Sequence, residues 1–145
     1  MRFASLLAAV FGILAAAAGS ADFAGELASA RERWAQHGSD HYRFTISDSC
    51  YCGPAVRGPV TVTVVDGEVS LRRASYLDPP VVRSPLHITI PRLFDWINEA
   101  LKRYPTANFR LDFDPVDGHP MRFEHDDPAV HDDQEVIVVE DFEHL

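Results

Sequence analysis

Residues 60–73 read VTVTVVDGEVSLRR and contain the clearest fold signal in the chain. Valines at 60, 62 and 64 alternate with threonines at 61 and 63, which is the period of a strand with one buried face. A second alternating run, from Val69 to Arg72, follows after Asp66-Gly67. Asp-Gly between two such runs favours a hairpin, because both residues adopt positive φ angles. We therefore predict an antiparallel hairpin at residues 59–73.

Other segments have the same strand period. Apolar residues alternate with polar ones at 42–46, at 109–114 and at 121–124. A second Asp-Gly pair, Asp117-Gly118, separates the last two segments and predicts another hairpin. Residues 136–139 are four consecutive apolar residues, so this strand is expected at the centre of the sheet or covered on both faces.

Two segments have a helical period. An apolar stripe runs from Phe23 to Trp34, and Gly38 is suited to end that helix. After a proline-containing connection at 74–88, Thr89 is placed to cap a second helix, with Pro91 in its first turn.

The predicted order is therefore helix, three strands, helix, three strands. We interpret it as two α-β-β-β units, at about 22–75 and 89–142, within a single α+β domain at 22–145. One unit alone cannot bury its sheet face well, whereas two can share a core. Short connections predict an antiparallel sheet with the helices on one face and the other face partly free.

The N-terminus has the pattern of a secretory signal peptide. Met1-Arg2 is a short basic start, residues 3–18 are apolar, and small residues continue to Ala21. The alternative is a membrane anchor, but this apolar stretch is shorter than the ~20 residues of a spanning helix. We expect cleavage after Ala18 or Ala21 and a periplasmic or secreted protein without a membrane segment.

The charge of the chain excludes one class of partner. Its 145 residues have a formal charge of −9, and removal of residues 1–21 takes away one arginine and no acid. Binding to nucleic acid requires a basic face, so nucleic acid is not expected as a partner. Nothing in the sequence indicates a cofactor.

Cys50 and Cys52 are the only cysteines, and they lie two residues apart beside Gly53-Pro54. In an oxidising compartment two such thiols are expected to form a disulfide, provided that the chain bends there. A metal site that uses both thiolates, a redox-active dithiol and two free buried thiols are the alternatives.

The seven histidines support a weaker metal hypothesis. His125 and His131 lie in an acidic stretch, and histidine with carboxylate suits zinc or a similar ion. Together with Cys50 and Cys52 they are the candidate ligands. The spacing matches no zinc motif, and a solvated acidic loop explains the same residues. His119, between Gly118 and Pro120, is interpreted as a turn residue.

The charged residues of the strands give a candidate binding surface, and Asp112 and Asp114 occupy the same strand face if the alternation continues. Paired carboxylates can perform acid–base catalysis, so a small hydrolase using Asp112, Asp114 or His125 is one hypothesis. Cross-strand ion pairs with arginines are the simpler explanation. The predicted surface is bordered by Arg43, Arg72, Arg110 and Arg122 and includes both aspartates.

Several landmarks follow one another in an order that extends over nearly all of residues 22–145. They are Cys50-Tyr51-Cys52, the stretch from Val62 to Val69, Thr89-Ile90 before Leu93-Phe94 and Ile97, Phe113-Asp114 before Gly118-His119-Pro120, and Asp132-Asp133. In this order the chain resembles an uncharacterised family of small exported bacterial proteins, domain of unknown function 6174. Phe113 and His119 stand where tyrosine is more frequent in that family. The resemblance implies export and no established activity.

The order of two α-β-β-β units also resembles exported modules related to peptidase propeptides and β-lactamase-inhibitor proteins. The signal-peptide pattern, the partly free sheet face and the lack of a catalytic motif in the sequence favour binding rather than catalysis. We therefore expect a non-catalytic binding or interaction module of the cell envelope, whose partner is an exported protein or a peptide. Inhibition of an envelope enzyme is one form of this hypothesis. A metal-binding protein and a small hydrolase are the alternatives.

Overall fold

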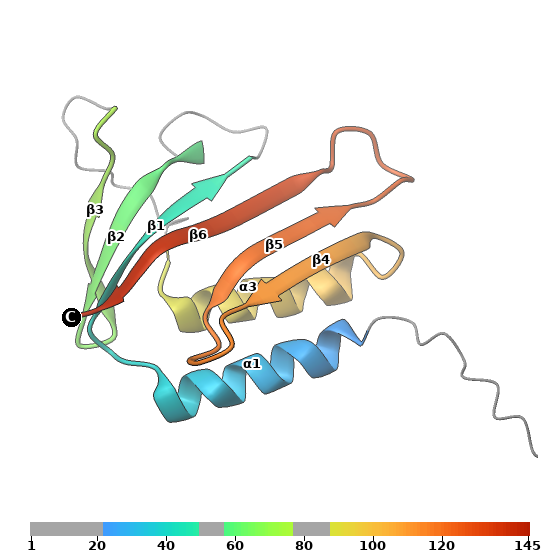
Figure 1. Ribbon diagram of the computed structural model, residues 1–145. Coiled ribbons are helices and arrows are strands. Elements are labelled where there is room, and N and C mark those ends of the chain that lie inside the picture. Colours follow the sequence, from blue (N-terminus) through green and yellow to red (C-terminus); the bar gives the residue numbers. More distant parts are fainter. Residues whose placement is uncertain (1–21, 50–56, 77–87) are drawn as a thin grey trace, which may run out of the picture.

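The computed structural model describes residues 22–49, 57–76 and 88–145. The first unit consists of α1 (Phe23–His37), β1 (Tyr42–Asp48), β2 (Val60–Val65) and β3 (Glu68–Arg73). The second consists of α3 (Ile90–Arg103), β4 (Asn108–Phe113), β5 (Pro120–Asp126) and β6 (Glu135–His144). The predicted order of two α-β-β-β units is confirmed (Figure 1).

The six strands form one antiparallel sheet in the order β3-β2-β1-β6-β5-β4. Each unit contributes three consecutive strands, and the units join where β1 of the first pairs with β6 of the second. β6 therefore lies at the centre of the sheet, as its apolar run predicted, and β3 and β4 form the two edges. The α+β fold with an antiparallel sheet is thus confirmed.

Both helices lie on the same side of the sheet (Figure 1). The side chains of β1 follow this division, because Tyr42, Phe44 and Ile46 are buried whereas Arg43 between them is exposed. The two helices contact each other, and an ion pair of 2.9 Å joins Arg31 to Asp95. On the opposite face of the sheet the described residues contain no helix.

Residues of both units form one core cluster under the helices. The hydroxyl group of Tyr42 accepts a hydrogen bond of 2.9 Å from the backbone N–H of Ile90, so the first unit holds the start of α3. Thr89 is the N-cap residue as predicted, but its side chain makes no capping hydrogen bond. It bonds to Tyr42 instead.

The two Asp-Gly pairs form different turns. Asp66 and Gly67 have φ angles of 54° and 74°, which confirms the tight turn predicted between β2 and β3. Between β4 and β5, however, Phe113 pairs with Pro120, so residues 114–119 form a longer loop. The hairpin predicted at Asp117-Gly118 is therefore confirmed, with a connection longer than a two-residue turn.

Register shifts change which side chains face the helices. A shift between Thr63 and Val64 places Leu71 opposite Thr63 and Arg72 opposite the buried Val62. Cross-strand neighbours share a face of the sheet, so Arg72 lies on the helix-covered face and Leu71 is 41% exposed. The sequence prediction that Arg72 borders the free face is therefore wrong.

Candidate functional site

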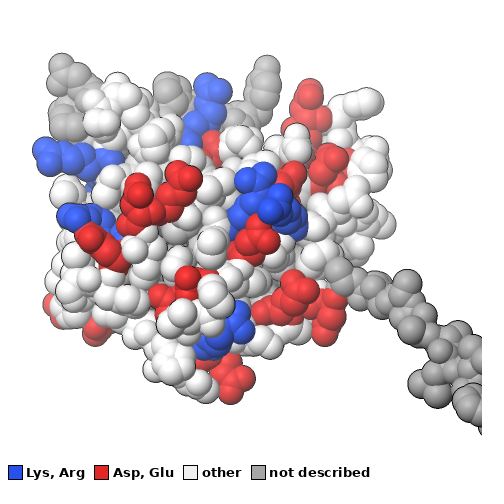
Figure 2. All heavy atoms as spheres, viewed as in Figure 1, with Lys and Arg blue, Asp and Glu red and all other residues white. Residues whose placement is uncertain are grey.

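The helix-free face of the sheet carries three ion pairs between strand residues. They join Arg43 to Glu143, Arg110 to Asp112 at 3.1 Å, and Arg122 to Glu124 at 2.9 Å. The first pair crosses from β1 to β6, where these two residues are cross-strand partners, whereas the other two run along β4 and β5. Basic and acidic side chains accordingly alternate over the surface in Figure 2.

The pairing of β4 with β5 extends this alternation across the strands. Arg110 lies opposite Glu124, and Asp112 lies opposite Arg122. Each charged group therefore has an oppositely charged neighbour both along its strand and across it. The cross-strand ion pair predicted for Asp112 is not the one observed, because Asp112 pairs with Arg110 on its own strand and only faces Arg122 across the strands. Exposed pairs of this kind stabilise a fold by only about 0–1 kcal/mol each, so the groups can exchange these partners for those of a ligand.

A groove with a volume of about 1030 Å³ opens beside these charges. Residues of α1, β4, β5 and β6 line it. Its basic groups are Arg33, Arg110 and Arg122, and its acidic groups include Asp112 and Glu140. Three residues of the predicted binding surface thus line the groove.

Asp114 does not join Asp112, contrary to the prediction that they share a strand face. It follows the last residue of β4, and its Oδ1 accepts hydrogen bonds from the backbone N–H groups of Val116 (2.7 Å) and Asp117 (3.0 Å). Burial opposes ionisation of Asp114, but these N–H donors and the charge of His119 outweigh it and lower the pKa of Asp114. Asp114 therefore organises the 114–119 loop of this hairpin.

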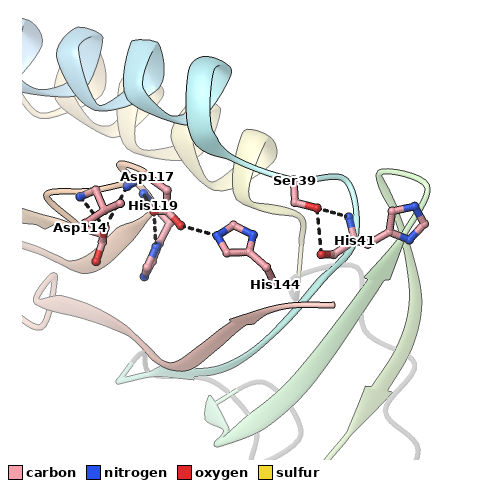
Figure 3. Close-up of polar contacts among 7 residues, drawn as sticks. Ser39, His41, Asp114, Asp117, His119 and His144 are labelled. Carbon is pink, nitrogen blue, oxygen red and sulfur yellow. Dashed lines mark hydrogen bonds and ion pairs between the residues drawn. The ribbon is translucent and has the colours of Figure 1, made fainter.

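A second polar group lies within this loop (Figure 3). Asp117 is buried between two imidazoles, with its Oδ1 2.6 Å from Nδ1 of His119 and its Oδ2 3.0 Å from Nε2 of His144. The ring of His119 stacks on Phe142 with centroids 4.0 Å apart. His119 is thus a buried partner of Asp117 as well as a loop residue, and nothing in the sequence indicates that Asp117 binds both His119 and His144.

The cluster contains one group of three metal-ligating atoms within 4.8 Å of one another, from Asp114, Asp117 and His119. Each of these atoms has a local role, since Asp114 caps the loop and Asp117 binds both imidazoles. In the described part of the chain, neither imidazole is hydrogen-bonded to a hydroxyl or thiol nucleophile. The arrangement therefore suits a structural clamp that fixes the loop against the end of β6.

A further group of titratable side chains lies at the opposite end of β5, beneath α3. His125 is 3% exposed, and its Nε2 lies 3.2 Å from Oε2 of Glu135. Asp48 ends β1 on the same helix-covered face. Burial, and after it the charge of Glu135, raise the pKa of Asp48 to about 7, against the opposing effect of the charge of His125.

Several buried polar atoms in this region lack hydrogen-bond partners. Within the described residues, Oδ1 of Asp48, Nδ1 of His125 and Oδ2 of Asp133 are buried without a hydrogen-bond partner. Burial also raises the pKa of Glu135; the charge of Asp133 adds to this shift and a hydrogen bond with Trp96 opposes it. We call Asp48, His125 and Glu135 the buried acid–histidine group.

The model of a family of unknown function (DUF6174) matches residues 26–144. The chain belongs to this family. The match begins within α1 and ends at the last residue of β6, so the groove, the Asp117 clamp and the buried acid–histidine group all lie in the DUF6174 domain. No curated protein and no solved structure matches the chain.

The domain does not bring the predicted metal ligands of the acidic stretch together. His125 is buried against Glu135, whereas His131 is exposed in the loop between β5 and β6. Neither belongs to the converging group of ligand atoms found among the described residues. The three predicted hydrolase residues are also separate, with Asp112 on the free face, Asp114 in the 114–119 loop and His125 at the other end of β5.

Two predictions concern residues outside the described ranges. Cys50 and Cys52 fall in the gap at 50–56, and the signal-peptide pattern falls at 1–21. Both remain predictions. Across the described residues, the DUF6174 domain has no helix that is long and apolar enough to cross a membrane.

Proposed function

We propose that this DUF6174 domain is a non-catalytic binding module of the cell envelope that holds an exported protein or peptide in the groove lined by α1, β4, β5 and β6. The observation that supports this proposal is the groove of about 1030 Å³ lined by alternating basic and acidic side chains. The signal-peptide pattern at residues 1–21 supports export to the periplasm or beyond the cell.

An extended polypeptide fits the spacing of these charges. Alternate side chains on one face of a strand stand about 7 Å apart, which is also the repeat of an extended ligand. Arg110 and Asp112 are such a pair on β4, and Arg122 and Glu124 are one on β5. Arg110, Asp112 and Arg122 line the groove, whereas Glu124 lies outside its lining, so a segment with basic and acidic residues in alternation can meet complementary charges at these three positions. A polyanion cannot, because acids and bases alternate there.

Photo-crosslinking from within the groove tests the proposal. Met121 lines the groove and is 41% exposed, so a photoreactive phenylalanine analogue at this position can reach a bound partner. The matched control is the same analogue at Val130, which is 50% exposed in the loop between β5 and β6. Exported proteins of the native cell should crosslink at position 121 and not at position 130.

Reversal of the groove charges distinguishes specific binding of a partner from non-specific adhesion. Arg110→Glu combined with Arg122→Glu places four acids together on β4 and β5, and we expect the position-121 crosslinks to fall at least about tenfold. The double variant Arg110→Asp, Asp112→Arg keeps the net charge and exchanges the two signs. Equal crosslinking at positions 121 and 130, or crosslinks that survive both changes, would contradict the proposal.

The proposed location has its own test. Cell fractionation should place the protein in the periplasm or the medium, and its N-terminal sequence should begin at Gly19 or Asp22. A full-length chain retained in the cytoplasm would contradict export without affecting the groove.

A further inference from the structure

A second cavity, separate from the groove, lies on the helix-covered side of the molecule. It has a volume of about 380 Å³ and lies between α3 and the start of β6. Small-molecule sites in proteins usually have volumes of about 300–1,000 Å³ and combine apolar walls with a few polar groups. Its lining consists of Trp96, Glu99, Ala100, Arg103, Tyr104 and Glu135.

The inner wall of this cavity is acidic and lacks positive charge. The side chain of Glu135 is 17% exposed, and behind it lie His125 and Asp48. Glu135 contacts the imidazole directly, whereas Asp48 interacts with it through its charge. One oxygen of Asp48 has no hydrogen-bond partner in the described chain. Burial is the main cause of the raised pKa values of Asp48 and Glu135, and a cation in the cavity would favour their ionised forms and so offset part of that cost.

The other walls are aromatic. Trp96 hydrogen-bonds to Glu135, so the indole and the carboxylate form one continuous surface. The inner face of Tyr104 stacks on His125 with centroids 4.7 Å apart, and the guanidinium of Arg103 lies 5.8 Å from the centre of the Tyr104 ring. A positive group therefore already occupies the remaining face of this ring. Aromatic rings beside a partly buried carboxylate are the surroundings that organic ammonium groups prefer.

The same features disfavour a bare metal ion. Within the described residues, three metal-ligating atoms converge only at Asp114, Asp117 and His119, which do not line this cavity. The cavity is also much larger than an ion, and its aromatic walls offer no ligand atoms to one. An ammonium group with an alkyl body can fill it and contact both kinds of wall.

We propose that the cavity between α3 and β6 binds a small organic cation through an ammonium group, with Glu135 as its counter-charge and Trp96 and Tyr104 as its walls. Arg103 competes for Tyr104 at the rim. The site is independent of the groove that supports the proposed function, because no residue lines both cavities.

Titration of the purified protein with choline and with n-butylamine tests this proposal, with tryptophan fluorescence and calorimetry as readouts. Sodium chloride at matched ionic strength serves as the blank, and zinc chloride serves as the metal arm. We expect a saturable response to at least one amine, with a dissociation constant of about 1 mM or tighter. Trp96→Phe should remove the fluorescence response and assign it, because the other tryptophan, Trp34, lies among residues of the opposite helix.

Matched substitutions locate the counter-charge. Glu135→Gln keeps the shape of the side chain and should weaken amine binding at least about tenfold. Glu99→Gln makes the same change at the rim, where the side chain is 72% exposed, and should weaken binding by less than about threefold. Arg103→Ala, at an exposed position, should tighten binding because it removes the competing cation.

Three results would overturn the proposal. The first is the absence of saturation by either amine, or a response equal to that of sodium chloride. The second is equal binding by Glu135→Gln and Glu99→Gln. The third is a response to zinc alone. If Glu135→Gln does not fold, Arg103→Ala decides, since unchanged or weaker amine binding by this variant also contradicts the proposed site.

Discussion

Replacement of Asp48 by asparagine should stabilise the protein at neutral and alkaline pH. Asp48 ends β1 on the helix-covered face, near Glu135 and His125. Asparagine has nearly the same shape but no charge, so Asp48→Asn removes the ionisation and little else. Burial, and to a smaller extent the charge of Glu135, raises the pKa of Asp48 from 3.8 to about 7.

The direction and size of this change in stability follow from the linkage between proton binding and folding. Below pH 3.8 the carboxyl group is protonated in both the folded and the unfolded chain, and it has no effect on stability. As the pH rises from 3.8 to about 7, the unfolded chain is ionised while the folded chain holds the proton, so stability falls. At about 1.4 kcal/mol per pKa unit the loss reaches at most about 4 kcal/mol. Asp48 keeps partial contact with solvent, and we therefore expect about 2 kcal/mol.

Urea denaturation, followed by circular dichroism across the range from acid to mildly alkaline pH, measures this difference. The free energies of unfolding of Asp48→Asn and the native protein should converge in acid and separate by about 2 kcal/mol above neutrality. The control is Asp112→Asn on the free face, where the side chain is 42% exposed and ion-paired to Arg110. It should change stability by less than about 0.5 kcal/mol. A constant difference at all pH values, or a less stable Asp48→Asn above neutrality, would refute the reasoning.

Further predictions concern the 114–119 loop and the cysteines. Asp117→Ala should lower the free energy of unfolding by about 2–4 kcal/mol in urea denaturation, because two imidazoles and a backbone N–H lose a buried acceptor. Gly118→Ala should cost about 3 kcal/mol by the same assay, since its φ is 82° and a β-carbon would lie 2.3 Å from a carbonyl oxygen of α1. Gly67→Ala, with a φ of 74° but open space around it, should cost only about 1 kcal/mol. The intact mass of the exported protein should lie about 2 Da below that of the dithiol if Cys50 and Cys52 form the predicted disulfide, and an undiminished mass would contradict it.

The regular parts of the fold could be predicted because each depends on a short stretch of sequence. The alternation around Asp66-Gly67 specifies the β2–β3 hairpin, and the four apolar residues at 136–139 indicate a central strand. The predictions failed where the period of two breaks. A register shift between Thr63 and Val64 moves Leu71 to the free face and Arg72 to the covered one. The residue types around this position do not indicate a bulge.

The buried acid–histidine group was missed although the sequence contains its signal. Asp48 continues the inward alternation of Tyr42, Phe44 and Ile46, and Glu135 stands in phase with the inward-facing residues of β6. A carboxylate at an inward-facing position can be exposed to solvent at the end of its strand, or it can be a buried charge. The alternation of side chains alone does not distinguish these two cases. The partners of Asp117 were beyond prediction because His144 lies at the far end of the chain and meets it only through the sheet order.

β6 follows the other five strands of the sheet in the chain, so it is synthesised after them, and it is one of the two middle strands of the finished sheet. Until it is synthesised, β1 and β5 each lack a neighbour on one side, and the two three-stranded parts of the sheet cannot join. A nascent chain that stalls before residue 135 therefore presents open strand edges, which other chains can pair with. Late completion of the sheet would also keep the chain unfolded for longer, as the proposed export through a membrane channel requires. Truncation of only the last ten residues should consequently prevent folding of the whole domain rather than fray its end.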